Sequence, residues 1–252
     1  MLLAEDTILF LSSDWKVFKE KKENTKWFDF QLEFYAASAV MTELIINQYL
    51  SLEKGGLITA VREPADIDIP YYHTVWSRVK QDPGKKNFVY WNNLFSDLYK
   101  FDRQSSESFG LYDQIAKYLE DKGFFEIKKH KFLIIFKFAT TTTSSKGIQH
   151  LKEKVADLNQ SIESGQFPDQ LLMLAILLSK DFTNILNGFL TPEKLSRLEL
   201  LIKDPSYRNQ HQLVFTLANL MKFAYFEKFL PQQGEEKIDL DHQLTNQYQP
   251  KS

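Results

Sequence analysis

The chain has 252 residues, of which 43% are hydrophobic and 25% are charged, and its formal net charge is -2. This balance is that of a globular protein with a substantial core, and so small a charge gives no whole-molecule attraction to nucleic acid or to an anionic membrane. The absence of cysteine excludes disulfide bonds and thiol catalysis within the chain. The sequence has neither a glycine-rich phosphate loop nor a paired-histidine zinc motif. We therefore expect a non-enzymatic protein that uses no cofactor.

The amino-terminal stretch MLLAEDTILFLSSDW carries Glu5 and Asp6 where a secretory signal would carry positive charge. The longest uninterrupted apolar run, Leu171–Leu178, is far shorter than the ~20 residues that cross a bilayer. The sequence therefore predicts a cytoplasmic protein, which would reach a membrane only by binding to its surface.

The first clear helix is expected over residues 29–49, and between Phe34 and Ile46 it is apolar around almost its whole circumference. A helix without a polar face is a buried helix. Glu43 lies inside this stretch, and a buried carboxyl group needs a hydrogen-bonding partner or stays protonated. A structural role for Glu43 is favoured over catalysis. The glycines of EKGG end the helix, and LITAV, over residues 57–61, is typical of a short strand.

A second helix is expected over residues 111–122, followed by Gly123 and the stretch FFEIKKHKFLIIFKF. This stretch predicts a β-hairpin with a basic tip at residues 128–131 and a second strand, Phe132–Phe138, that is apolar on both faces. One face is expected to pack on the domain, and the other to meet either a second subunit or a membrane. Both alternatives stay open. The predicted contact residues are Phe125, Ile127, Lys128, Lys129, Lys131, Leu133 and Ile135.

The rest of the chain is predicted to be helical, over residues 148–163, 168–190, 191–204 and 210–230. The segment 168–190 is apolar all round at its centre, and the next begins with a capping threonine, Thr191, followed by proline. The predicted fold is mainly α: a single domain over residues 1–230, with a buried central helix surrounded by amphipathic helices and one or two small β-hairpins. The polar, glutamine-rich tail at 231–252 is expected to be loosely ordered.

Several apolar stretches follow one another in a particular order: LLAEDTILFLSSD, AVMTELIINQYLSLE, IAKYLEDKGFFEIKKHKFLIIFKF and DQLLMLAILLSKDFTNIL. Together they resemble the Golgi phosphoprotein 3-like family, from about residue 2 to about residue 222. The resemblance implies a single mainly α-helical domain with a projecting hairpin. The eukaryotic members are peripheral Golgi proteins that bind phosphatidylinositol 4-phosphate and act as adaptors retaining glycosyltransferases, so it also implies a phosphoinositide ligand and client proteins.

The lipid site of that family uses one tryptophan and several arginines. Carried over to this chain, the tryptophan position falls on Phe28, with Trp27 beside it, and the arginine positions fall on Ala37, Phe109 and Tyr112. Arginine binds phosphate through two parallel hydrogen bonds, and none of these residues can replace it. Selectivity for the phosphoinositide is therefore expected to be weak or absent. The pattern would suit a distant member of the family, such as a bacterial one.

The order of helix, glycine and basic hairpin also occurs in winged-helix DNA-binding proteins, which is the alternative function. The candidate recognition helix at 111–122 has more acidic than basic side chains, and phosphates would repel it. We therefore expect no nucleic-acid partner. The favoured function is that of a peripheral membrane or adaptor protein, whose partners would be an anionic lipid surface, client proteins and a second copy bound through the hairpin.

Overall fold

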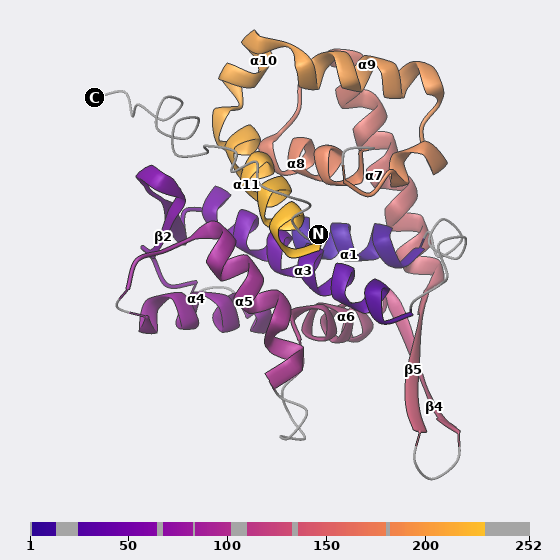
Figure 1. The fold of residues 1–252 in the computed structure, drawn as a ribbon. Coiled ribbons are helices and arrows are strands. Elements are labelled where there is room, and N and C mark those ends of the chain that lie inside the picture. The colour runs from indigo at the N-terminus through magenta and orange to yellow at the C-terminus, as the bar shows by residue number, and fades with distance from the viewer. Residues whose placement is uncertain are drawn as a thin grey trace.

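A computed structural model describes residues 2–13, 25–64, 68–82, 84–101, 110–132, 136–179 and 182–229 (Figure 1). Of these, residues 25–30, 98–101, 128–132 and 136–141 are described by their backbone alone. The fold is mainly α-helical, as the sequence predicts, with two small antiparallel sheets. The predicted boundary at residue 230 and the tail at 231–252 lie outside the described residues.

The α-helices occupy most of the described chain. They are α1 (Leu3–Ser13), α3 (Thr25–Ile46), α4 (Pro70–Gln81), α5 (Phe88–Phe101), α6 (Leu111–Asp121), α7 (Ser145–Ser164), α8 (Asp169–Leu178), α9 (Pro192–Lys203), α10 (Pro205–Gln210) and α11 (Gln212–Phe229). The 3-10 turns are η1 (Lys54–Gly56) and η2 (Ile185–Gly188). The strands are β1 (Leu50–Leu52), β2 (Leu57–Ala60), β3 (Lys86–Asn87), β4 (Phe125–Phe132) and β5 (Phe136–Thr143). Within the described residues, no helix is long and apolar enough to cross a bilayer.

Helix α3 forms the centre of the core. Every side chain from residue 32 to residue 45 is buried, and α1, α4, α5 and α6 pack against the helix (Figure 1). Helix α8 is likewise buried from Leu172 to Leu178. Both observations confirm the prediction that a helix without a polar face lies inside the protein.

Two buried glutamates of α3 hold neighbouring helices at their amino-terminal ends. The Glu43 carboxylate accepts hydrogen bonds from the backbone N–H groups of Leu3 (2.9 Å) and Ala4 (3.3 Å), where α1 begins. The Glu33 carboxylate accepts one from the backbone N–H of Tyr112 (3.1 Å), where α6 begins. A helix amino-terminus has unpaired N–H groups and a partial positive charge, so it is a favourable partner for a carboxylate. The predicted structural role of Glu43 is consistent with these contacts.

The helix predicted over residues 168–190 is shorter than expected, and α8 ends at Leu178. The hydroxyl of Ser179 donates to the carbonyl oxygen of Ile176 (2.7 Å), and Asn184 adopts a left-handed conformation with φ 59 before η2 begins. Short polar side chains compete with the helical hydrogen bonds in this way. The predicted cap of the following helix is confirmed. The Thr191 hydroxyl accepts a hydrogen bond from the backbone N–H of Lys194 at the start of α9.

Candidate functional site

The β4–β5 hairpin is the feature of the fold that leaves the helical body. The strands pair antiparallel from Phe125 opposite Thr143 to Phe132 opposite Phe136. Each strand has 8 residues, which corresponds to about 25 Å at ~3.3 Å per residue. Figure 1 shows the hairpin projecting away from the helices at the lower right. Both strands are edges, and such a two-stranded ribbon is only marginally stable alone in water.

The structure corrects the predicted hairpin in two respects. Residues 128–131, expected at the tip, lie within β4, and the segment that joins the strands is 133–135. The reason is the run of threonines at 140–143, whose β-branched side chains favour an extended strand and pair with residues 125–128. The predicted packing of one whole face on the domain is also wrong, since beyond its base the hairpin lies clear of the helices (Figure 1). Near the base, Phe125 is buried and Ile127 is half-buried.

The register divides the hairpin into two unlike faces. Alternation along paired strands places positions 129, 131 and 137 on one face, and these are all lysines. Positions 132, 136 and 138, all phenylalanines, share the opposite face with His130 and Lys128. Lys131 and Lys137 are direct register partners.

The end of α6 fixes the point at which the hairpin leaves the body. Gly123 has φ 77, which favours glycine, and its N–H donates to the carbonyl oxygen of Glu120 (2.8 Å). The N–H of Phe124 donates to the carbonyl oxygen of Leu119 (2.8 Å). These two hydrogen bonds form a Schellman motif, which ends the helix and sets the direction of β4.

The start of α7 holds this junction from the other strand. The Ser144 hydroxyl donates to the carbonyl oxygen of Gly123 (2.7 Å), and the Lys146 amine donates to that of Lys122 (2.7 Å). Gly147 lies so close that an added Cβ would come within 2.5 Å of the carbonyl oxygen of Phe124 and 2.6 Å of Thr143 Cγ2. The hairpin therefore projects from a closely packed base.

A cluster of charged and polar side chains from α1 and α7 lies next to the base of the hairpin. Asp6 of α1 is buried, and its carboxylate lies 2.7 Å from His150 Nε2 and 3.5 Å from Lys154 Nζ on α7. The ring of His150 contacts Phe124 edge to face, with centroids 5.6 Å apart, and Lys146 Nζ lies 4.4 Å from the centroid of Phe124. These contacts join α1, α7 and the root of β4.

The residues that the family resemblance assigns to a lipid site are only partly described. Trp27 and Phe28 belong to α3, of which only the backbone is described at these two positions. Phe109 lies outside the described residues. Ala37 is fully buried in the core, so its side chain reaches no surface. Tyr112 is half-buried at the start of α6. The lipid pocket stays a prediction.

Buried acids surround the start of α1. Burial raises the pKa of Glu43 from its ordinary value of 4.5 to about 8, although its two backbone hydrogen bonds favour the charged form. Burial also raises the pKa of Glu5, whose carboxylate accepts a hydrogen bond from the hydroxyl of Tyr71 (2.8 Å). The hydroxyl of Tyr72 faces Glu43 without a hydrogen bond of normal geometry. Glu5 and Glu43 are almost completely enclosed, which suits a structural role.

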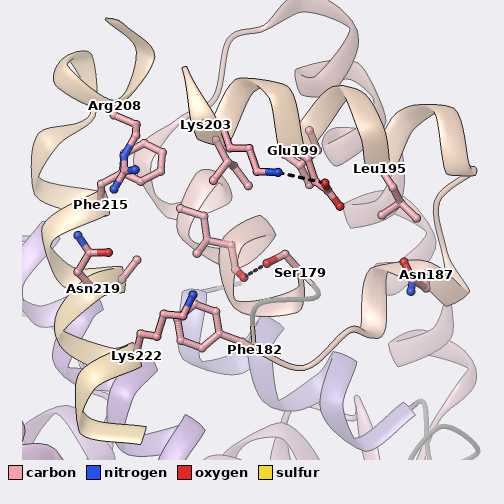
Figure 2. Close-up of a pocket in the computed structure, with 14 residues that line it drawn as sticks. Ser179, Phe182, Asn187, Leu195, Glu199, Lys203, Arg208, Phe215, Asn219 and Lys222 are labelled. Atoms are coloured by element: carbon pink, nitrogen blue, oxygen red, sulfur yellow. Dashed lines mark hydrogen bonds and ion pairs between the residues drawn. The ribbon is translucent and has the colours of Figure 1, made fainter. Parts of the chain in front are cut away.

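A cavity of about 200 Å³ opens between α8, η2, α9, α10 and α11 (Figure 2). Apolar side chains form much of its wall, and three cationic residues, Lys203, Arg208 and Lys222, line it together with the acidic Glu199. The remaining lining residues are Ile176, Ser179, Phe182, Asn187, Leu195, Leu198, Ile202, Phe215, Ala218 and Asn219. Sequence analysis missed this site, because five elements contribute to it and no local motif marks it.

In the described parts of the chain, no group of three or more histidine, aspartate and glutamate side chains could hold a metal ion. On α6, Lys117 forms ion pairs with Glu120 (2.8 Å) and Asp121 (2.8 Å). This lysine is therefore already paired with two carboxylates of its own helix.

Comparison with known protein families found no match, and no curated protein is significantly similar to the chain. The resemblance to the Golgi phosphoprotein 3-like family accordingly stays a prediction. The hairpin carries the functional argument.

Proposed function

We propose that the protein is a non-enzymatic peripheral membrane module that docks on an anionic lipid surface through the β4–β5 hairpin. The observation that carries this proposal is the register of the hairpin at its far end. The segment joining the two strands, 133–135, is Leu-Ile-Ile, and the last strand pair is Phe132 opposite Phe136. The last described pair of the hairpin is therefore apolar, and the sequence that connects its two members is apolar as well.

Lysines follow this apolar end along both strands. Lys131 and Lys137 form the next register pair, and Lys129 and Lys128 lie further towards the body. A bilayer offers apolar chains below a layer of headgroups, which matches this order. Each lysine near an anionic surface contributes about 1 kcal/mol, and each buried methylene group about 0.8 kcal/mol. The two contributions together support reversible binding even though the net charge of the chain is -2.

The competing occupant of the hairpin is a second copy of the chain. Unpaired strand edges favour pairing between copies. Four lysine positions in the paired strands oppose this association, because two hairpins would bring their positive charges together. This charge pattern favours the lipid surface, and client proteins would then bind elsewhere on the body.

Vesicle sedimentation tests the proposal. The full-length protein should bind phosphatidylserine-containing vesicles and not pure phosphatidylcholine vesicles. Replacing Leu133 and Ile135 with serine should weaken binding at least about tenfold, since several buried methylene groups are lost. The matched control replaces Ile148 and Leu200, exposed apolar residues on α7 and α9, with serine. This control should bind as the wild type does.

Two results would contradict the proposal. One is unchanged vesicle binding by a folded Leu133→Ser/Ile135→Ser protein. The other is a wild-type dimer in analytical ultracentrifugation that binds no vesicles and dissociates in this variant, which would make the hairpin a subunit interface. Loss of folding in the variant, with no effect of Lys129→Gln/Lys131→Gln on vesicle binding, would make the hairpin a purely structural element.

A further inference from the structure

The root of the hairpin is anchored to the body by two consecutive phenylalanines in different surroundings. Phe125, the first residue of β4, is buried in the core with 2% of its surface exposed. Phe124, directly before it, packs against α7, where the ring of His150 meets its ring edge to face with centroids 5.6 Å apart. Lys146 Nζ, also on α7, lies 4.4 Å from the centroid of the same ring. A ribbon held at one point can swing about it, whereas two anchors fix its direction.

A carboxylate of α1 orients the imidazole that contacts Phe124. The side chain of Asp6 is 5% exposed, and its carboxylate lies 2.7 Å from His150 Nε2 and 3.5 Å from Lys154 Nζ. A buried carboxylate without a partner is costly, so this contact favours one orientation of the His150 ring. In that orientation the ring also makes the edge-to-face contact that aromatic pairs prefer. His150 therefore connects α1 to the root of β4.

We infer that His150 is a positioning residue: paired with Asp6, it holds the ring of Phe124 against α7 and so keeps the β4–β5 hairpin at a fixed angle to the helical body. The hairpin needs such support because a two-stranded ribbon is only marginally stable alone, and beyond its base it lies clear of the helices (Figure 1). The consequence for docking rests on the proposed function. A hairpin at a fixed angle would present the body to a membrane in one orientation, whereas a hinged hairpin would leave that orientation free.

Another histidine–aspartate pair of the chain provides a matched control. His211 Nδ1 lies 2.8 Å from Asp169 Oδ1, and the His211 side chain is 11% exposed, close to the 16% of His150. The His211 ring also contacts an aromatic ring, that of Tyr207, with centroids 4.7 Å apart. This pair joins α8 to the residue between α10 and α11, and α10 lies at the top of the molecule in Figure 1, away from the hairpin at the lower right. Removing either imidazole breaks the same kinds of contact, but of the two only His150 contacts the hairpin root.

Amide hydrogen exchange on the full-length protein tests the inference. The backbone N–H groups of Phe124 and Ser144 report on the root, since the first donates to the carbonyl oxygen of Leu119 (2.8 Å) and the second to that of Phe124 (3.0 Å). In His150→Ala both should exchange at least about tenfold faster while the amides of α3 keep their rates, because local opening costs less than unfolding. His211→Ala should leave the root unchanged. Exchange that rises equally in the root and in α3 would overturn the inference, since His150 would then support the whole fold.

Spin labels measure the angle directly. The chain has no cysteine, so labels can be attached at Thr140→Cys on β5 and at Gln160→Cys, an exposed position of α7. The distribution of distances between the two labels should be narrow in the otherwise unchanged protein and in His211→Ala, and broad in His150→Ala. Phe124→Leu removes the ring on the hairpin side and leaves the imidazole–carboxylate pair in place. It should broaden the distribution as well, and it decides the question if His150→Ala does not fold.

Vesicle binding separates this inference from the membrane proposal. A narrow distribution that broadens in the variants, in a protein that binds no vesicles, would support the inference and overturn only the proposed function. A broad distribution in a wild-type background that does bind vesicles would overturn the inference and leave the membrane proposal standing. An equally narrow distribution in Phe124→Leu would overturn the inference too, because the hairpin would then keep its angle without the contact between α7 and the ring.

Discussion

At the scale of single residues, the most consequential side chain is Glu43, a carboxyl group in the centre of the core. Its two oxygens accept N–H groups at the start of α1, and this contact fixes the amino-terminal helix against α3. Burial nevertheless raises its pKa to about 8. The folded protein therefore holds a proton at pH values where the unfolded chain, with a pKa near 4.5, has lost it. Stability should then fall as the pH rises between these two values.

Glu43→Gln tests this linkage, because glutamine does not titrate in this range. Urea unfolding at pH 5 and pH 8 should show the wild type losing stability, with a maximum slope on the order of 1.4 kcal/mol per pH unit. The variant should lose less over the same interval, and the part that remains should reflect Glu5, whose pKa burial also raises. An identical pH dependence in the two proteins would show that Glu43 is ionised in the fold throughout this range.

The structural role of Glu43 could be predicted from the sequence, since a single acid in an apolar helix needs a partner. The role of Glu33 could not. Its carboxylate accepts a hydrogen bond from the N–H of Tyr112 and lies where a Cβ on Gly110 would overlap it. Nothing local to Glu33 indicates a partner 79 residues away. The cavity was missed for the same reason: its cations are unremarkable surface residues until three separate helices bring them together.

At the scale of elements, predictions succeeded where the sequence carries its own start or stop signal. Gly123 ends α6 and Thr191 caps α9. Helices α1, α4 and α5 were not predicted, although α4 has proline at its first position and the side chain of Asn87 accepts from the N–H of Tyr90 at the start of α5. In helix α1 the acidic residues Glu5 and Asp6 are buried together with the apolar ones, so their charge does not mark an exposed face in the sequence.

Ala39→Asp tests whether α3 organises the fold. Ala39 is completely buried, so the new carboxylate would lie in the core without a partner and should cost several kcal/mol of unfolding free energy, on the order of 3 to 5. The control Ala156→Asp makes the same change at an exposed position of α7 and should cost about 1 kcal/mol or less. Equal thermal stability of the Ala39→Asp variant and the wild type would show that α3 is not central.

At the scale of the whole molecule, the charge distribution matters more than the total. The net charge of -2 predicts no attraction to anionic surfaces, yet the hairpin places lysines next to its apolar end and the cavity gathers three cations of its own. Helices α9 and α10, which contribute to the cavity wall, lie at the top of the molecule in Figure 1, whereas the β4–β5 hairpin projects from the lower right.

The last prediction concerns lipid selectivity. Where the family resemblance places arginines, this chain has Ala37, Phe109 and Tyr112, and Ala37 is buried. Binding should therefore depend on total charge. Vesicles matched for surface charge, containing either phosphatidylinositol 4-phosphate or phosphatidylserine, should bind the protein with affinities within about threefold of each other. Raising the salt from ~0.1 M to ~1 M shortens the Debye length from ~10 Å to ~3 Å and should weaken both interactions.

The lysines of the hairpin should account for this salt dependence. Lys129→Gln/Lys131→Gln should weaken binding to both kinds of vesicle about equally, by roughly 2 kcal/mol at low salt, whereas Lys54→Gln/Lys152→Gln should have little effect. A preference of more than about tenfold for phosphatidylinositol 4-phosphate would contradict charge-driven binding. It would mean that other basic residues form a headgroup pocket, because the side chains at the matched positions carry no positive charge.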